Sequence, residues 1–88
     1  MDFLNLFSKS LQDKGERDCF DKYLSPHVPM IYKSAIRMCG NPNNAQDLVQ
    51  ETLYSALKNF HQIHDPEKSK YWMFSILRNL FLKDIEKT

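Results

Sequence analysis

Residues 43–57 constrain the fold most, because they predict one helix with two dissimilar faces. Small and apolar side chains recur at spacings of three and four, which places them on one stripe that a helix has to bury. This stripe consists of Ala45, Val49, Thr52, Leu53, Ala56 and Phe60. The opposite face is acidic and rich in hydrogen-bonding groups, and it consists of Asp47, Gln50, Glu51, Tyr54 and Lys58. Asn44 is the expected N-cap, since its side chain can accept from the first backbone N–H groups.

The segments before this helix are expected to be helical as well. Residues 16–24 and 30–39 both carry apolar side chains at helical spacing. Between them, residues 25–29 contain two prolines, which predict a break or kink because proline lacks a backbone donor and restricts the preceding residue. Gly40 and Pro42 are typical of a helix end.

The segments after it predict a loop and a final helix. The helix that contains residues 43–57 is expected to end near Phe60 or Gln62, and a polar stretch containing Pro66 follows. The last helix, residues 71–87, is apolar over most of its circumference. Three of its apolar residues predict a partner surface, a dimer contact or an edge left by truncation, and these are Phe81, Leu82 and Ile85.

Length and charge set the class of protein. A chain of 88 residues suits one modest core, so we expect an all-α domain: a small helical bundle of three to four main helices over 16–88, with an arm or short helix at 1–15. The formal net charge is +1. Residues 1–57 carry six basic and seven acidic side chains and residues 58–88 carry six and four, so a polyanion should prefer the last third.

Few residues suggest chemistry. The chain has no phosphate-binding glycine loop and no hydrolase or zinc-protease motif, so we expect no enzyme activity and no cofactor. His61 and His64 with Asp65 are too few ligands for a metal, and a solvated pair is the better interpretation. Cys19 and Cys39 are expected to be reduced thiols. No leader or membrane-spanning stretch is evident, which predicts a cytoplasmic protein without a membrane partner.

Two motifs resemble region 2 of bacterial sigma factors of the extracytoplasmic-function (ECF) type. The first is Asp-Leu-Val-Gln-Glu-Thr at 47–52, followed by Tyr54, and it is similar to the helix by which these factors bind RNA polymerase core. The second is Trp-Met-Phe-Ser-Ile-Leu-Arg-Asn-Leu at 72–80, and it is similar to the helix that meets the −10 promoter element. The resemblance covers about residues 16–87 and implies a helical region 2 fold.

The resemblance also implies partners and sites. It implies that the helix of the first motif docks on the clamp coiled coil of the largest RNA polymerase subunit, through Asp47, Leu48, Gln50, Glu51 and Tyr54. It implies that the loop and last helix open and hold single-stranded −10 promoter DNA, through His61, His64, Lys68, Lys70, Tyr71, Trp72, Arg78, Asn79 and Lys83. For Trp72, packing of the loop on the bundle is favoured over base contact. Whether an anti-sigma factor is a further partner stays open.

Some features depart from the family pattern. Gln46, Ser69 and Ser75 stand where acidic, aromatic and basic residues are usual, and the last two weaken the expected DNA contacts. No region 4 helix-turn-helix follows in the 88 residues, so we expect an isolated domain or a truncated relative. The alternative function is a helical protein-interaction module without a role in transcription.

Overall fold

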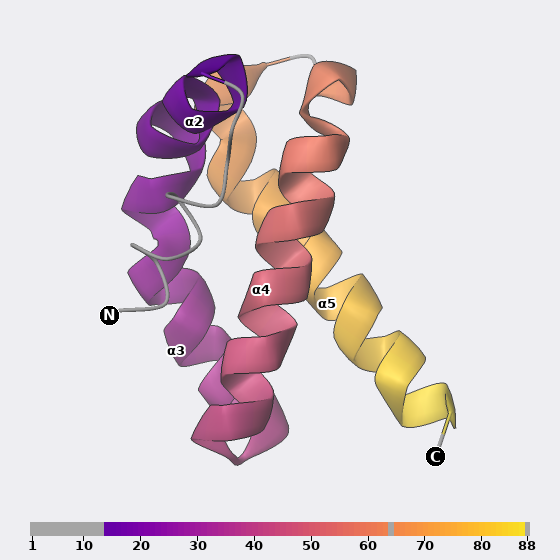
Figure 1. The fold of residues 1–88 in the computed structure, drawn as a ribbon. Helices are drawn as coiled ribbons and strands as arrows, with labels where there is room; N and C mark the ends of the chain where they lie inside the picture. Colours follow the sequence, from indigo (N-terminus) through magenta and orange to yellow (C-terminus); the bar gives the residue numbers. More distant parts are fainter. Residues whose placement is uncertain (1–13, 64, 88) are drawn as a thin grey trace.

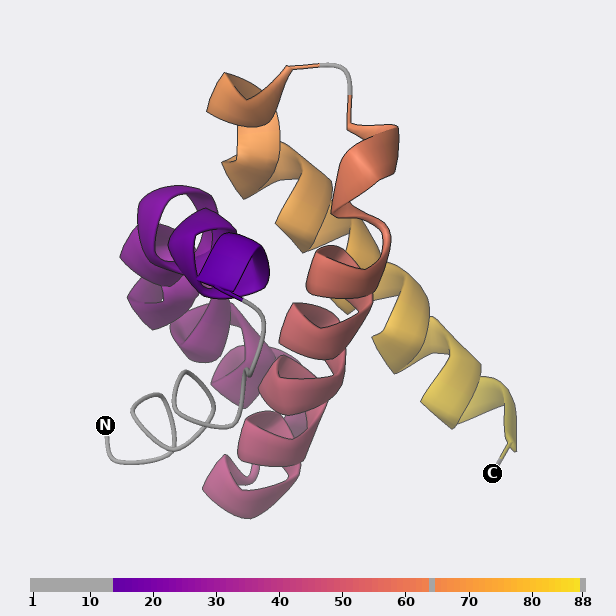
Figure 2. The same cartoon turned by 45° about the horizontal axis from the view of Figure 1, so that its top comes forward.

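The protein is described by a computed structural model that covers residues 14–63 and 65–87, including every side chain except those of Glu16, Cys19, His61, Glu86 and Lys87. Its longest described helices are α3 (Val28–Cys39), α4 (Pro42–Lys58) and α5 (Ser69–Lys87). Helix α4 packs against both of the others, and α3 also contacts α5 (Figure 1). The short helix α2 (Lys14–Cys19) lies at the end where α5 begins (Figure 2). The all-α prediction is confirmed.

The two prolines change the type of helix rather than ending it. After α2 the chain forms a π-helical turn, Phe20–Leu24, and a 3-10 turn, Ser25–His27. Helix α3 then begins at Val28, two residues earlier than expected, because Pro29 fits a first turn, where its missing N–H has no helical acceptor to lose. The chain therefore stays helical through 25–29, with a change of helix type where a break or kink was predicted.

The turn between α3 and α4 depends on Gly40 and Asn41. Gly40 adopts φ of 69°, a left-handed conformation that favours glycine, and its N–H donates to the Ile36 carbonyl. Asn41 caps α4, because its side-chain oxygen accepts from the backbone N–H groups of Asn43 at 2.8 Å and Asn44 at 3.3 Å. The expectation that Asn44 is the N-cap is wrong. Pro42 occupies the first turn, which moves the cap three residues upstream.

The core follows the predicted stripe of α4. Ala45, Val49, Thr52, Leu53 and Ala56 are fully buried, while Phe60 is half-buried just beyond the helix. They pack with buried residues of the other elements, which are Phe20, Leu24, Val28, Ile31, Ala35, Met73 and Leu77. Thr52 is accommodated because its hydroxyl donates to the Leu48 carbonyl at 2.8 Å.

The loop between α4 and α5 has order of its own. Phe60–Gln62 and Pro66–Lys68 form 3-10 turns, and the Asp65 carboxylate caps the second by accepting from the Glu67 N–H at 3.0 Å. The buried Ser69 hydroxyl donates to the Pro66 carbonyl, so α5 begins at Ser69 rather than Tyr71. Among the described helices, none is both long and apolar enough to cross a membrane.

Candidate functional site

The outward face of α4 gathers four of the side chains that the sequence singled out. Asp47, Gln50, Glu51 and Tyr54 are all exposed, and Tyr54 as a whole residue is 65% exposed. They lie opposite the buried stripe because the helical period separates the two sets. Within the described part of the chain, none of the four has a side-chain hydrogen bond or an ion pair. This face therefore offers carboxylates, an amide and an aromatic ring to a partner.

Leu48 does not belong to that exposed face. It is 3% exposed and packs into the core beneath α4. The expectation that Leu48 presents its side chain to a partner is corrected, since so little of its surface is accessible. Leu48 supports the position of Asp47 and Glu51 on either side of it along the helix.

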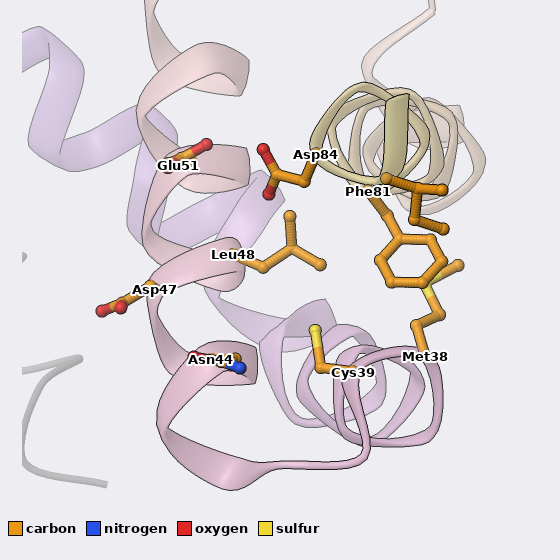
Figure 3. Close-up of a pocket in the computed structure, with 9 residues that line it drawn as sticks. Met38, Cys39, Asn44, Asp47, Leu48, Glu51, Phe81 and Asp84 are labelled. Carbon is orange, nitrogen blue, oxygen red and sulfur yellow. The ribbon is translucent and has the colours of Figure 1, made fainter. Parts of the chain in front are cut away.

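A groove lies where the end of α3, the first half of α4 and the end of α5 meet (Figure 3). It has a volume of about 390 Å³. Glu51 and Asp84 point toward each other from α4 and α5, with Leu48 below them, while the Asp47 carboxylate points outward at the rim. The other lining residues are Met38, Cys39, Asn44, Phe81 and Ile85. The groove thus has an apolar floor beneath carboxylates.

Cys39 contributes a thiol to this groove. Burial, and secondly the negative charge of Asp84, raise the pKa of Cys39 above its usual value. Because both causes disfavour the thiolate, Cys39 stays a neutral, weakly reactive thiol at neutral pH.

A second hollow adjoins the groove along α4. It has a volume of about 460 Å³ and is lined by Gln50, Glu51, Tyr54, Ser55 and Leu80. Its walls are mostly apolar, and Glu51 lines both hollows. The side of α4 that faces α5 therefore carries two depressions joined at one carboxylate.

A third hollow lies at the other end of the bundle, beside the loop. It has a volume of about 340 Å³ and is lined by Ile63, Asp65, Lys68, Tyr71, Trp72 and Ser75. Tyr71 is 70% exposed, and the Lys70 ammonium lies 5.7 Å from the centroid of its ring. Trp72 is half-buried and packs edge-on against Phe60, with centroids 5.9 Å apart.

The remaining expected DNA contacts are more scattered. Arg78, Asn79 and Lys83 are exposed farther along α5 and do not line the loop hollow. The side chain of His61 and the whole of His64 lie outside the described residues. In the part of the chain that is described, no cluster of three or more metal-ligating side chains forms.

Comparison with known proteins identifies the family. Residues 24–88 match the model of Sigma-70 region 2. The chain belongs to the sigma-70 region 2 family. The match includes all of α3, α4 and α5, so the α4 face, the groove and the loop hollow all lie within the region 2 domain.

Relatives of this region 2 domain are ECF RNA polymerase sigma factors. EcfG of Rhodopseudomonas palustris is 45% identical over 60 residues, which are 68% of this chain and 33% of that protein. SigW of Bacillus subtilis is 31% identical over 74 residues, which are 84% of this chain and 40% of that protein. The chain thus spans between about a third and two fifths of the length of these relatives. No solved structure is significantly similar to it.

Sequence reasoning missed part of this region 2 surface. Met38, Cys39 and Asp84 line the groove but were not candidates, because they lie on other helices than residues 47–54, α3 for the first two and α5 for Asp84. A signal was present in the apolar excess at Phe81 and Ile85, which pointed to a surface near the C-terminus without saying what lies opposite.

Proposed function

We propose that this region 2 domain docks on RNA polymerase core through the outward face of α4 and holds single-stranded −10 promoter DNA at its loop end. It acts in transcription initiation in the cytoplasm by binding rather than by catalysis. On the polymerase, its partner is the clamp coiled coil of the largest subunit. The observation that carries the proposal is the exposure of Asp47, Gln50, Glu51 and Tyr54 on one face of a helix whose other face is sealed in the core.

The chemistry of the α4 face supports a helical protein partner. Carboxylates form short, charge-assisted hydrogen bonds with arginine, and an exposed tyrosine supplies a large contact area with a polar tip. Because Asp47, Glu51 and Tyr54 have no side-chain partner within the described residues, a docking helix does not have to break contacts first. The membership in the sigma-70 region 2 family supports the identity of that partner.

The residues at the loop end have the chemistry that binding of a single-stranded nucleic acid requires. A single strand needs cations for phosphates and planar groups on which bases stack. Lys68 and the exposed Tyr71 line one hollow, and Lys70 lies beside the tyrosine ring. Arg78, Lys83 and Asn79 extend the exposed polar surface along α5, where the amide of Asn79 suits a base edge. Trp72 contributes by holding α5 against Phe60.

The two ends also differ in charge. Asp47, Glu51 and Asp84 lie toward one end of the α4–α5 pair, where Lys83 is the only neighbouring basic residue among the expected DNA contacts that the structure describes, whereas Lys68 and Lys70 lie at the loop end. Loop carboxylates Asp65 and Glu67 offset part of this positive charge, although Asp65 is engaged as a cap. A basic protein surface and a polyanion can therefore bind at separate places.

A pull-down with purified polymerase core tests the docking. The variant Gln50→Ala/Glu51→Ala removes two exposed side chains without disturbing the core and should no longer be retained. The control is Gln62→Ala/Glu67→Ala, which removes the same residue types from the loop and should bind normally. Equal retention of both variants contradicts docking through α4.

A further inference from the structure

The groove at the ends of α3, α4 and α5 has features that the docking proposal does not use. Its walls include Leu48, Phe81 and Met38, and its carboxylates Glu51 and Asp84 face each other from different helices (Figure 3). These two negative charges repel each other across the apolar floor. Neither carboxylate has a hydrogen-bonded or ionic partner among the described residues. The groove is therefore complementary to a cationic group with an apolar stem.

The size of the groove limits what it can take. An α-helix with its side chains is about 10–12 Å across, so a cavity of this volume cannot enclose one. At about 390 Å³, it can receive one or two side chains from a helix that lies over it. Lysine and arginine fit best, because their methylene stems cover apolar surface while the charged head reaches a carboxylate.

The position of the groove points to the partner. Glu51 lines both this groove and the hollow that contains Gln50 and Tyr54. A helix docked on the α4 face therefore passes over Glu51, and the second helix of a coiled coil, about 8–10 Å away, can lie toward α5. The last turns of α5 diverge from α4, which leaves that side accessible (Figure 1).

We propose that this groove is a second contact for the polymerase coiled coil, in which a lysine or arginine stem lies against Phe81 and Met38 and its charge pairs with Glu51 and Asp84. This inference rests on the proposed function. It makes the last turns of α5 part of the docking surface and assigns Asp84 a role in binding polymerase.

Affinity measurements with the 88-residue chain and polymerase core test the role of Asp84. Asp84→Asn keeps the shape and removes the charge, so it should weaken binding about three- to fivefold at low salt. The difference should shrink at high salt, because screening weakens exposed charge pairs. Glu67→Gln is the matched control, since Glu67 is an exposed carboxylate on the loop, and it should bind as the unsubstituted chain does.

The outcomes separate the two proposals. If Asp84→Asn binds as tightly as the unsubstituted chain while Gln50→Ala/Glu51→Ala fails to bind, the groove contact is wrong and docking through α4 stands. If the unsubstituted chain does not bind core at all, both are overturned. An equal loss for Asp84→Asn and Glu67→Gln also overturns the groove contact, because it indicates a general charge effect.

Cys39 supplies an independent readout from inside the groove. In a Cys19→Ser background, bound core should slow alkylation of Cys39 at least about tenfold, because a covered thiol cannot reach the reagent. The control places a cysteine on the exposed side of α3, as Lys33→Cys in a chain lacking both native thiols, and its alkylation should be unaffected. Equal alkylation of Cys39 with and without bound core overturns the proposal.

Discussion

Phe60 and Trp72 pack edge to face across the loop that joins α4 to α5, with ring centroids 5.9 Å apart and ring planes at 73°. On its other side, Phe60 lies 5.5 Å from the Tyr23 ring of the π-helical turn. One phenylalanine thus links three segments that are distant in sequence. The start of α5, which carries Tyr71 toward the loop hollow, is held in place by this aromatic row.

The row predicts a loss of stability in Phe60→Leu. Leucine keeps much of the volume but loses both ring contacts, each worth about 0.5–1.5 kcal/mol, so the free energy of unfolding should fall by about 1–3 kcal/mol. Urea denaturation measures this change. Tyr71→Leu is the control, because its ring is mostly exposed, and it should change stability by less than about 0.5 kcal/mol. If the free energy of unfolding is the same in Phe60→Leu as in the unsubstituted chain, the ring contacts do not contribute to stability.

The cap of α4 predicts a difference between two asparagines. Asn41→Ala should lower the free energy of unfolding by about 1 kcal/mol, because two backbone N–H groups lose their acceptor. Asn44→Ala should be close to neutral, since Asn44 donates its backbone N–H and its side chain caps nothing in the described structure. The two melting curves decide between them, and a larger effect at Asn44 would contradict the cap.

The sequence was sufficient for the helices whose spacing is regular. The buried stripe of α4 was predictable because apolar and small side chains keep the helical period along a helix of 17 residues. The cap was misplaced because three asparagines lie within four positions, so residue preference alone did not decide among them. Pro42 decided it in the fold, by fitting the first turn.

The groove could not be predicted in the same way. Leu48 lies three positions after Ala45 and four before Thr52, so the helical period places it beside the buried stripe, and its role in docking was implied by the family resemblance rather than by this spacing. Asp84 lies 33 positions after Glu51, and no local sequence pattern relates the two. Their meeting depends on where α5 crosses α4, which is a tertiary property.

The Cys39 thiol predicts a pH dependence of stability in a Cys19→Ser background. The unfolded chain loses the Cys39 proton at lower pH than the folded chain does, because the pKa is raised on folding, chiefly by burial. The stability that the raised pKa of Cys39 contributes is fully present below about pH 8.5 and is lost as pH rises through the pKa of the folded chain. Replacing Cys39 by Ala should flatten the fall of unfolding free energy between pH 8 and 10, as measured by urea titration.

Asp84 can be tested within the same experiment. Asp84→Asn should move the pKa of Cys39 back toward its usual value without fully restoring it, because burial is the larger cause. The pH dependence of the alkylation rate reports this pKa directly. An alkylation profile that does not move would show that Asp84 lies too far from the thiol to influence it.

The loop end predicts distinct roles for two neighbours on α5. Arg78→Ala should weaken binding of single-stranded −10 DNA and reduce the slope of log affinity against log salt by about 0.7, as expected for one lost phosphate contact. Asn79→Ala should instead change the preference among bases with the salt slope unchanged. Fluorescence titrations over a range of salt separate the two effects, and an unchanged base preference would remove Asn79 from the DNA surface.

Docking through α4 is tested most directly by the equilibrium dissociation constant for polymerase core. Two central side chains that each contribute about 2 kcal/mol or more correspond to a loss approaching about a thousandfold in affinity, and this is the predicted result for Gln50→Ala/Glu51→Ala. Its unfolding free energy should stay within about 0.5 kcal/mol of the unsubstituted chain, because both side chains are exposed. A folded double variant that binds core within about twofold of the unsubstituted chain, a difference of less than about 0.5 kcal/mol, would contradict the account.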